Sequence, residues 1–186
     1  MGIRTLRLLL LTTGLSACAL VGTDEGNRDG TCGQHSSCPS DQACGSGNCV
    51  DMLGRSYVVS AIELEVCDTN LDGEAFDSLD GTPPDPTVEL RFGGSVIFTS
   101  GIHDDTLMTT FTVPDEEVVI TDFNDSFVLE VSDNDLVVNE LMDTISIDVG
   151  YVGLRAGEVV EVNQSDCTES PVLRAAVVLK PTDGAW

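Results

Sequence analysis

The sequence predicts an all-β protein: an antiparallel, eight-stranded β-sandwich that follows a small, disulfide-stapled, Cys-rich segment. Three observations predict it. From residue 56 onward the chain consists of short runs rich in Val, Ile, Thr and Phe, separated by Gly, Asn and Asp turns. No window shows the periodicity of a long amphipathic helix. Ahead of these runs, residues 32–50 hold four of the 7 cysteines and almost no apolar side chains, so this segment needs cross-links to be stable.

The expected strands follow one another closely. In the first, residues 57–66, the pattern becomes alternating toward the end and places Ile62, Leu64 and Val66 on one face. Further runs lie at residues 87–92, 95–98, 107–113, 118–121, 127–132, 144–149, 159–162 and 173–179. Eight or so short strands at this spacing, with turns between them, are typical of a sandwich, here spanning residues 56–181.

The charge of the chain excludes several functions. Lys+Arg number 8 and Asp+Glu 32, a formal net charge of −24, while the hydrophobic share of 41% is enough for a packed core. Binding to nucleic acid phosphates requires clustered Lys and Arg, and so does purely electrostatic binding to an anionic membrane. The carboxylates therefore either face solvent or gather around cations.

The first segment, residues 1–17, is predicted to be a signal peptide. Two basic residues, Arg4 and Arg7, precede an apolar run that is too short to span a bilayer. The run ends in Leu15-Ser16-Ala17-Cys18. That tetrapeptide resembles the lipobox of bacterial lipoproteins, and the alternative is an ordinary secretory signal that happens to contain a Cys.

The lipobox resemblance implies a lipid anchor. In that family the Cys18 thiol takes a diacylglycerol, and cleavage makes Cys18 the new N-terminus. Residues 18–31 would then be a lipidated tether, because they are mostly small and polar. Ala19 replaces the Asp of the inner-membrane retention rule, which implies the bacterial outer membrane, facing either the periplasm or the cell surface.

Six cysteines remain, an even number in an oxidising compartment. The simplest partition has two bridges within Cys32, Cys38, Cys44 and Cys49, of undetermined connectivity, and one between Cys67 and Cys167. The alternative for the cluster is a zinc site with His35, which the lack of Cys-x-x-Cys spacing disfavours. Residues 38–50 resemble EB or Dickkopf modules; a simple stapled spacer is the favoured interpretation.

Two acidic segments interrupt the strands. Residues 68–86 form a long loop that contains Asp77, Asp80 and Asp85, and residues 132–140 form a second that contains Asp133, Asp135 and Glu140. Long loops in compact domains are usually functional or disordered. Carboxylates packed this closely repel one another unless they spread into water or bind a metal ion, and calcium takes six to eight oxygen ligands.

The two segments resemble the loops of the calcium-binding C2 domain. In that family an early loop ends in Asp-Pro-x-Val, here Asp85-Pro86-Thr87-Val88, and a later strand ends in Asp-x-Asp, here Asp133-Asn134-Asp135. The resemblance implies Ca²⁺ as cofactor and a set of six candidate ligands: Asp77 or Asp80 from the first loop, Asp85, Asp133, Asp135 and Glu140. The Lys-rich strand with which some members bind phosphoinositides is absent.

The resemblance also implies that the tips of the acidic loops contact lipid. Leu136, Val137 and Val138 lie between Asp135 and Glu140, and Phe76 and Leu79 lie in the first loop. In membrane-binding members such residues insert beside calcium-bridged phospholipid. The alternative is that they pack back onto the sandwich.

A competing calcium motif lies in the first loop. The run Asp68-Thr69-Asn70-Leu71-Asp72-Gly73 matches the opening of the helix-loop-helix calcium motif. Its twelfth position is Leu79 instead of Glu, and no helical pattern flanks it. The C2-like site is therefore the favoured interpretation, with solvated, turn-forming Asp residues as the alternative.

The predicted function is that of a membrane-anchored lipoprotein whose calcium-binding, C2-like domain mediates calcium-dependent binding to an anionic lipid or a protein. No enzyme is expected, because the only histidines are His35 and His103, and for the aromatic lining of a hydrolase cleft the chain offers Trp186 alone. The alternative is a metal-free adhesion or scaffold sandwich, with the Cys-rich module as the part that binds a partner.

Overall fold

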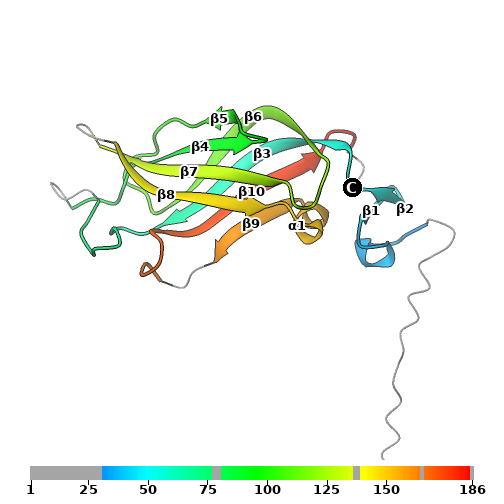
Figure 1. The fold of residues 1–186 in the computed structure, drawn as a ribbon, viewed down its shortest axis with the longest axis horizontal. Helices are drawn as coiled ribbons and strands as arrows, with labels where there is room; N and C mark the ends of the chain where they lie inside the picture. The colour runs from blue at the N-terminus through cyan, green and yellow to red at the C-terminus, as the bar shows by residue number, and fades with distance from the viewer. Residues whose placement is uncertain (1–30, 77–80, 136–138, 164–165, 185–186) are drawn as a thin grey trace, which may run out of the picture.

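The computed structural model describes residues 31–76, 81–135, 139–163 and 166–184. They form a small two-stranded hairpin and two packed four-stranded sheets (Figure 1). Every named strand pair is antiparallel. This confirms the predicted eight-stranded antiparallel sandwich. The predicted signal peptide, Cys18 and the tether up to residue 30 lie outside the described residues.

The first sheet of the sandwich has the strand order β6-β3-β10-β9, and the second has the order β5-β4-β7-β8. The strands of the first sheet are β3 (Arg55–Val66), β6 (Met108–Ile120), β9 (Glu158–Asn163) and β10 (Val172–Pro181). Those of the second are β4 (Pro86–Phe92), β5 (Ser95–Thr99), β7 (Ser126–Asn134) and β8 (Asn139–Asp148). A short helix, α1 (Tyr151–Ala156), connects β8 to β9.

The core lies between the two sheets and follows the two-residue period of the strands. On β7 the inward row begins with Phe127, Leu129 and Val131, all fully buried. Val88 and Leu90 of β4 continue the same layer in the neighbouring strand. This alternation fixes which side chains of β7 point inward, and it continues to the last inward-facing position of the strand.

Two expected boundaries are wrong. The predicted runs 107–113 and 118–121 belong to one strand, β6, which passes through Pro114 with a shift in its pairing to β3 between Val59 and Ala61. β6 is an edge strand, so the missing Pro N–H costs no ladder hydrogen bond. The second acidic segment, residues 132–140, is also mostly strand, because β7 extends to Asn134 and β8 begins at Asn139.

The disulfides follow the predicted partition, and the structure supplies the connectivity. Cys32 pairs with Cys44, Cys38 with Cys49, and Cys67 with Cys167. The sulfur atoms of Cys32, Cys38 and Cys49 lie within 4.8 Å of one another, but each belongs to a disulfide. The zinc alternative is therefore wrong, because zinc binds thiolates.

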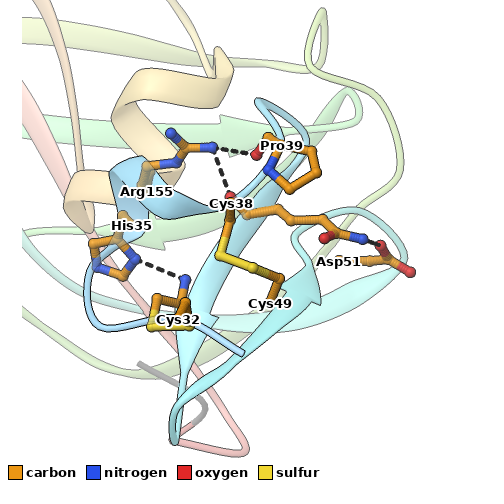
Figure 2. The surroundings of a disulfide bond; sticks show 9 residues. Cys32, His35, Cys38, Pro39, Cys49, Asp51 and Arg155 are labelled. Carbon is orange, nitrogen blue, oxygen red and sulfur yellow. Dashed lines mark hydrogen bonds between the residues drawn. A yellow bond between two sulfur atoms is a disulfide. The ribbon is translucent and has the colours of Figure 1, made fainter. Parts of the chain in front are cut away.

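The Cys-rich module, residues 32–51, contains the 3₁₀ turn η1 (His35–Ser37) and the hairpin β1 (Gln42–Gly45) and β2 (Asn48–Asp51). It packs against one end of the sandwich. Arg155 of α1 donates hydrogen bonds from Nη2 to the carbonyl oxygens of Pro39 and Gln42, both at 2.6 Å (Figure 2). Ala43 of the module and Met52 just after it are fully buried in the sandwich core.

Among the described residues, no helix is long and apolar enough to cross a membrane.

Candidate metal-binding site

The two acidic segments meet at the end of the sandwich opposite the Cys-rich module. β4 begins at Pro86 and β7 ends at Asn134, and the antiparallel ladder pairs Pro86 directly with Asp133 (Figure 1). The Asn134 N–H also donates to the Asp85 carbonyl at 3.1 Å. Strand pairing thus brings together the Asp-Pro and Asp-x-Asp motifs, which are 48 residues apart at the Asp85–Asp133 contact.

Asp133 is the central side chain of this end. It continues the inward row of β7 after Val131, and its exposed fraction is 0%. Its Oδ1 accepts a hydrogen bond from the Asp85 N–H at 2.7 Å. Its Oδ2 is buried and has no hydrogen-bond partner among the described residues. A buried carboxylate oxygen without a partner is costly and rare in folded proteins.

The surroundings of Asp133 disfavour its negative charge. Burial raises the pKa of the Asp133 carboxyl above its ordinary value, and the charges of Asp135 and Asp85 raise it further. The backbone N–H groups of Asp85 and Asn134 act in the opposite direction. Burial has the largest effect. A cation at Oδ2 would remove both the desolvation cost and the repulsion between these acids.

A third segment, residues 100–107 between β5 and β6, joins the site. The Asp105 N–H donates to Asp85 Oδ1 at 2.7 Å, and the Thr106 N–H donates to the Pro84 carbonyl at 3.0 Å. Asp105 has a φ of 50°, in the left-handed region that Asp tolerates better than most residues. Sequence reasoning missed this acid; the Asp104-Asp105 pair beside a Gly turn was the only local signal.

The remaining predicted ligands fall into two groups. Glu140 pairs with Asp133 across the β7–β8 ladder, and the charge of Asp135 acts on Asp133, so the structure places both at the same end. Asp77 and Asp80 lie outside the described residues, as do the tip candidates Leu136, Val137, Val138 and Leu79. Phe76 is buried in the core, so of the two alternatives it packs back onto the sandwich and does not form a membrane tip.

The competing run at residues 68–73 folds as a turn that uses its own side chain. Asn70 Oδ1 accepts hydrogen bonds from the backbone N–H groups of Asp72 and Glu74, at 3.0 and 3.1 Å. The run follows β3 almost directly instead of a helix. This contradicts the helix-loop-helix interpretation. Asp68 and Asp72 are exposed, which agrees with solvated, turn-forming acids.

The solved structures that resemble this chain include C2 domains. One C2 domain is 16% identical, with a TM-score of 0.43, and the match covers 67% of this chain and 97% of that chain. The calcium-bound pair of C2 domains of extended synaptotagmin 2 is 14% identical, with a TM-score of 0.46 and coverages of 69% and 46%. A single C2 domain of plant extended synaptotagmin 1 is 14% identical, with a TM-score of 0.44 and coverages of 69% and 95%.

At such low identities and TM-scores, this likeness carries no argument about a ligand or a partner. The chain also spans less than half of the two-domain extended synaptotagmin chain. No protein-family model matches the sequence, and no curated protein matches it. The chemistry of the site must therefore be argued from its own residues.

The donor set fits a hard divalent cation such as calcium, which prefers oxygen ligands. Asp133 offers a buried oxygen without a partner among the described residues, the charges of Asp85 and Asp135 act on it, Glu140 pairs with it across the ladder, and the Asp105 N–H binds Asp85. Within the described residues, however, no three carboxylates bring their oxygens within 4.8 Å of one another. An ion at this end would need these acids to converge further, or would need ligands from residues 77–80.

Proposed function

We propose that the protein is a lipoprotein anchored at Cys18 whose C2-like sandwich binds calcium at the acidic end and thereby binds anionic phospholipid. It is proposed as a binding protein and not as an enzyme. The observation that carries the calcium proposal is the buried Oδ2 of Asp133, which lacks a partner among the described residues. The proposed outer-membrane placement rests on Ala19, which follows Cys18 where the inner-membrane retention rule has Asp.

The acids of the proposed site are held by different contacts. Asp133 is held rigidly, because it belongs to the β7 ladder and its Oδ1 is fixed by the Asp85 N–H. Asp85 is held in turn by the Asp105 N–H. Asp135 directly follows the end of β7, and Glu140 lies in β8 opposite Asp133, so both would supply further carboxylates. When bound, calcium would supply positive charge and open coordination positions for phosphate oxygens.

Anionic lipid is the favoured partner because exposed aliphatic side chains accompany the acids. Leu71 in the first acidic loop is 59% exposed, and Ile102 in the segment that carries Asp105 is 49% exposed. Without a cation, the negative charge of this end repels an anionic bilayer. Neutralisation by calcium would remove the repulsion and let these apolar side chains enter the interface.

Titration calorimetry of the full chain in neutral detergent, with calcium added to the millimolar range, tests the proposal. We expect saturable heat that is lost when Asp133→Asn and Asp135→Asn are combined. Glu130→Gln is the matched control, because Glu130 is exposed on the outer face of the same strand. The absence of heat in the unaltered chain, or its persistence in the double variant, would refute the site.

A metal-free adhesion or scaffold sandwich is the second candidate. The observation that favours it is the spacing of the described carboxylates, no three of which bring their oxygens within 4.8 Å of one another. A thermal melt with calcium or with a chelator separates the two candidates. A bound ion must raise the midpoint, because it adds RT ln(1 + [L]/Kd) to the stability of the folded state. A metal-free sandwich gives the same midpoint in both conditions.

A further inference from the structure

The sandwich has two chemically different ends, joined by its longest central strand. β3 starts at Arg55, next to the Cys-rich module, and ends at Val66, where the first acidic loop begins (Figure 1). It is 12 residues long, which corresponds to roughly 40 Å at the rise of a β-strand. The entry point of the chain and the acidic end therefore lie on opposite sides of the sandwich.

The Cys-rich module is fixed to its end of the sandwich. Arg155 Nη2 links α1 to the Pro39 and Gln42 carbonyls, as Figure 2 shows. Tyr57 donates its buried hydroxyl hydrogen to the Met52 carbonyl at 2.7 Å, and the Gly54 N–H donates to the Ile120 carbonyl at 2.7 Å. Contacts from β3, β6 and α1 thus hold the module and its connection in one orientation.

The module is also fixed internally. Its two disulfides join all four cysteines of the segment, and His35 Nδ1 accepts a hydrogen bond from the Cys44 N–H at 2.9 Å. The Cys32 N–H is bonded to the Gly47 carbonyl at 2.8 Å. Hence the first described residues are part of the same body as the sandwich, and any anchor ahead of them attaches at the module end.

The length of chain ahead of the module limits what the acidic end can reach. A random coil as long as residues 18–30 spans roughly 20 Å on average. The acidic end lies beyond the module by at least the length of β3. For the loops to touch the membrane that holds Cys18, the long axis of the molecule would have to tilt down along that membrane or invert, and full inversion would stretch the tether close to its roughly 45 Å limit. Contact with a facing surface needs neither.

We propose that the Cys-rich module is a fixed spacer that directs the acidic end away from the anchored membrane, so that this end binds a second, facing, anionic phospholipid bilayer. This inference rests on the proposed function, namely the anchor at Cys18 and calcium binding at Asp133. It assigns the module an orienting role in place of a separate binding partner.

A two-vesicle assay tests it with the full lipidated chain. The protein is reconstituted in phosphatidylcholine vesicles, mixed with vesicles that contain phosphatidylserine, and clustering is followed by energy transfer between two lipid dyes. We expect calcium-dependent clustering that a chelator reverses and that the Asp133→Asn, Asp135→Asn double variant loses. Unchanged binding of calcium by calorimetry without any clustering would overturn the spacer proposal alone; no binding of calcium would refute the proposed function first.

The decisive arm places phosphatidylserine in the anchored vesicle as well. The unaltered chain should still cluster vesicles, because its short tether disfavours turning the acidic end back to its own membrane. A variant with roughly 30 Gly and Ser residues inserted after Gly30 can reach its own membrane. We expect its clustering to fall severalfold in this arm only. Equal loss of clustering in the unaltered chain would overturn the proposal.

A second variant tests the contact that fixes the module. Arg155→Gln removes the charged donor to Pro39 and Gln42, and we expect it to lose clustering when both vesicles carry phosphatidylserine. Arg91→Gln is the control, because it also removes an arginine charge, but one that forms its ion pair with Glu89 of the same strand. If Arg155→Gln clusters vesicles like the control, Arg155 does not orient the module.

Discussion

The two ends of the sandwich are stabilised in opposite ways. At the module end, Tyr57, Met52 and Ala43 are buried, and the Tyr57 hydroxyl has a partner. At the acidic end, the inward row of β7 finishes with the fully buried carboxylate of Asp133, one oxygen of which has no described partner. The module end is thus closed by packed apolar side chains, whereas the acidic end carries carboxylates that repel one another.

The difference indicates where the stability of the sandwich is concentrated. Burial of apolar groups and satisfied hydrogen bonds stabilises the module end. The acidic end instead buries the carboxylate of Asp133 and is cross-linked by the Cys67–Cys167 disulfide, whose first cysteine directly precedes the acidic loop. Four experiments test this comparison, from the largest expected effect to the smallest.

Removal of the Cys67–Cys167 disulfide should have the largest effect. The bridge has a sequence separation of 100. A bridge that closes such a long loop contributes about 4–5 kcal/mol in the chain-entropy description. We expect Cys67→Ala with Cys167→Ala to lower the free energy of unfolding by about this amount, measured by urea titration in chelator. Removal of Cys32–Cys44, with a separation of 12, should cost less; the reverse order would contradict the comparison.

Truncation of a buried side chain at the module end should have the next largest effect. Met52 has an exposed fraction of 0%, so Met52→Ala leaves a cavity at the module end and should cost about 3 kcal/mol in the same titration. Met108 is the matched control, because it is 70% exposed, and Met108→Ala should change stability little. Equal effects of the two changes would show that the module is not part of the core.

Asp133→Asn should change stability in the opposite direction from Met52→Ala when no metal is present. Because the folded-state pKa of Asp133 is raised, its contribution is fully favourable only below the ordinary pKa and is lost as the pH rises through the folded-state pKa. At pH 7 in chelator, the neutral side chain should therefore give an equal or higher melting midpoint.

The same variant should lose the stabilisation by calcium. For the unaltered chain this amounts to about 2.7 kcal/mol when the free calcium is 100 times Kd. Glu130→Gln, on the exposed face of β7, should keep it. A variant of Asp133 that is both less stable in chelator and fully stabilised by calcium would show that this carboxylate is structural.

Tyr57→Phe should have the smallest effect at neutral pH, a loss of about 1 kcal/mol for the hydrogen bond to Met52. Burial raises the pKa of Tyr57 to about 12. A raised pKa means that the contribution of Tyr57 is complete below pH 10 and is lost as the pH rises through about 12. The variant should lack this alkaline loss. Tyr151→Phe is the control, since Tyr151 is 46% exposed and should leave the pH profile unchanged.

Much of the fold was predictable because its signals are local. Strand periodicity indicates both sheets, and the cysteine count indicates the partition of the bridges. Pro114 misled the strand assignment, since its effect depends on β6 being an edge strand, which the sequence does not display. The second acidic segment resembles a loop in the sequence, because its acidic residues interrupt the apolar alternation that would indicate the continuation of β7 and β8.

The candidate site was predictable only in part. Asp85 and Asp133 belong to motifs that can be read along the chain, and their meeting follows from strand pairing. Asp105 comes from a third segment, and only the hydrogen bond to Asp85 reveals it. Asp133 could have been singled out by one further signal: it occupies the position after Phe127, Leu129 and Val131 in the inward alternation.

By itself the amino-acid sequence determined the β-strands, the cross-linked segment and the supply of carboxylates, because these depend on neighbours along the chain. Only the tertiary structure decided which carboxylate is buried, and that the module is fixed to the far end through Arg155. Burial and long-range hydrogen bonds depend on segments brought together by folding, so no local pattern encodes them.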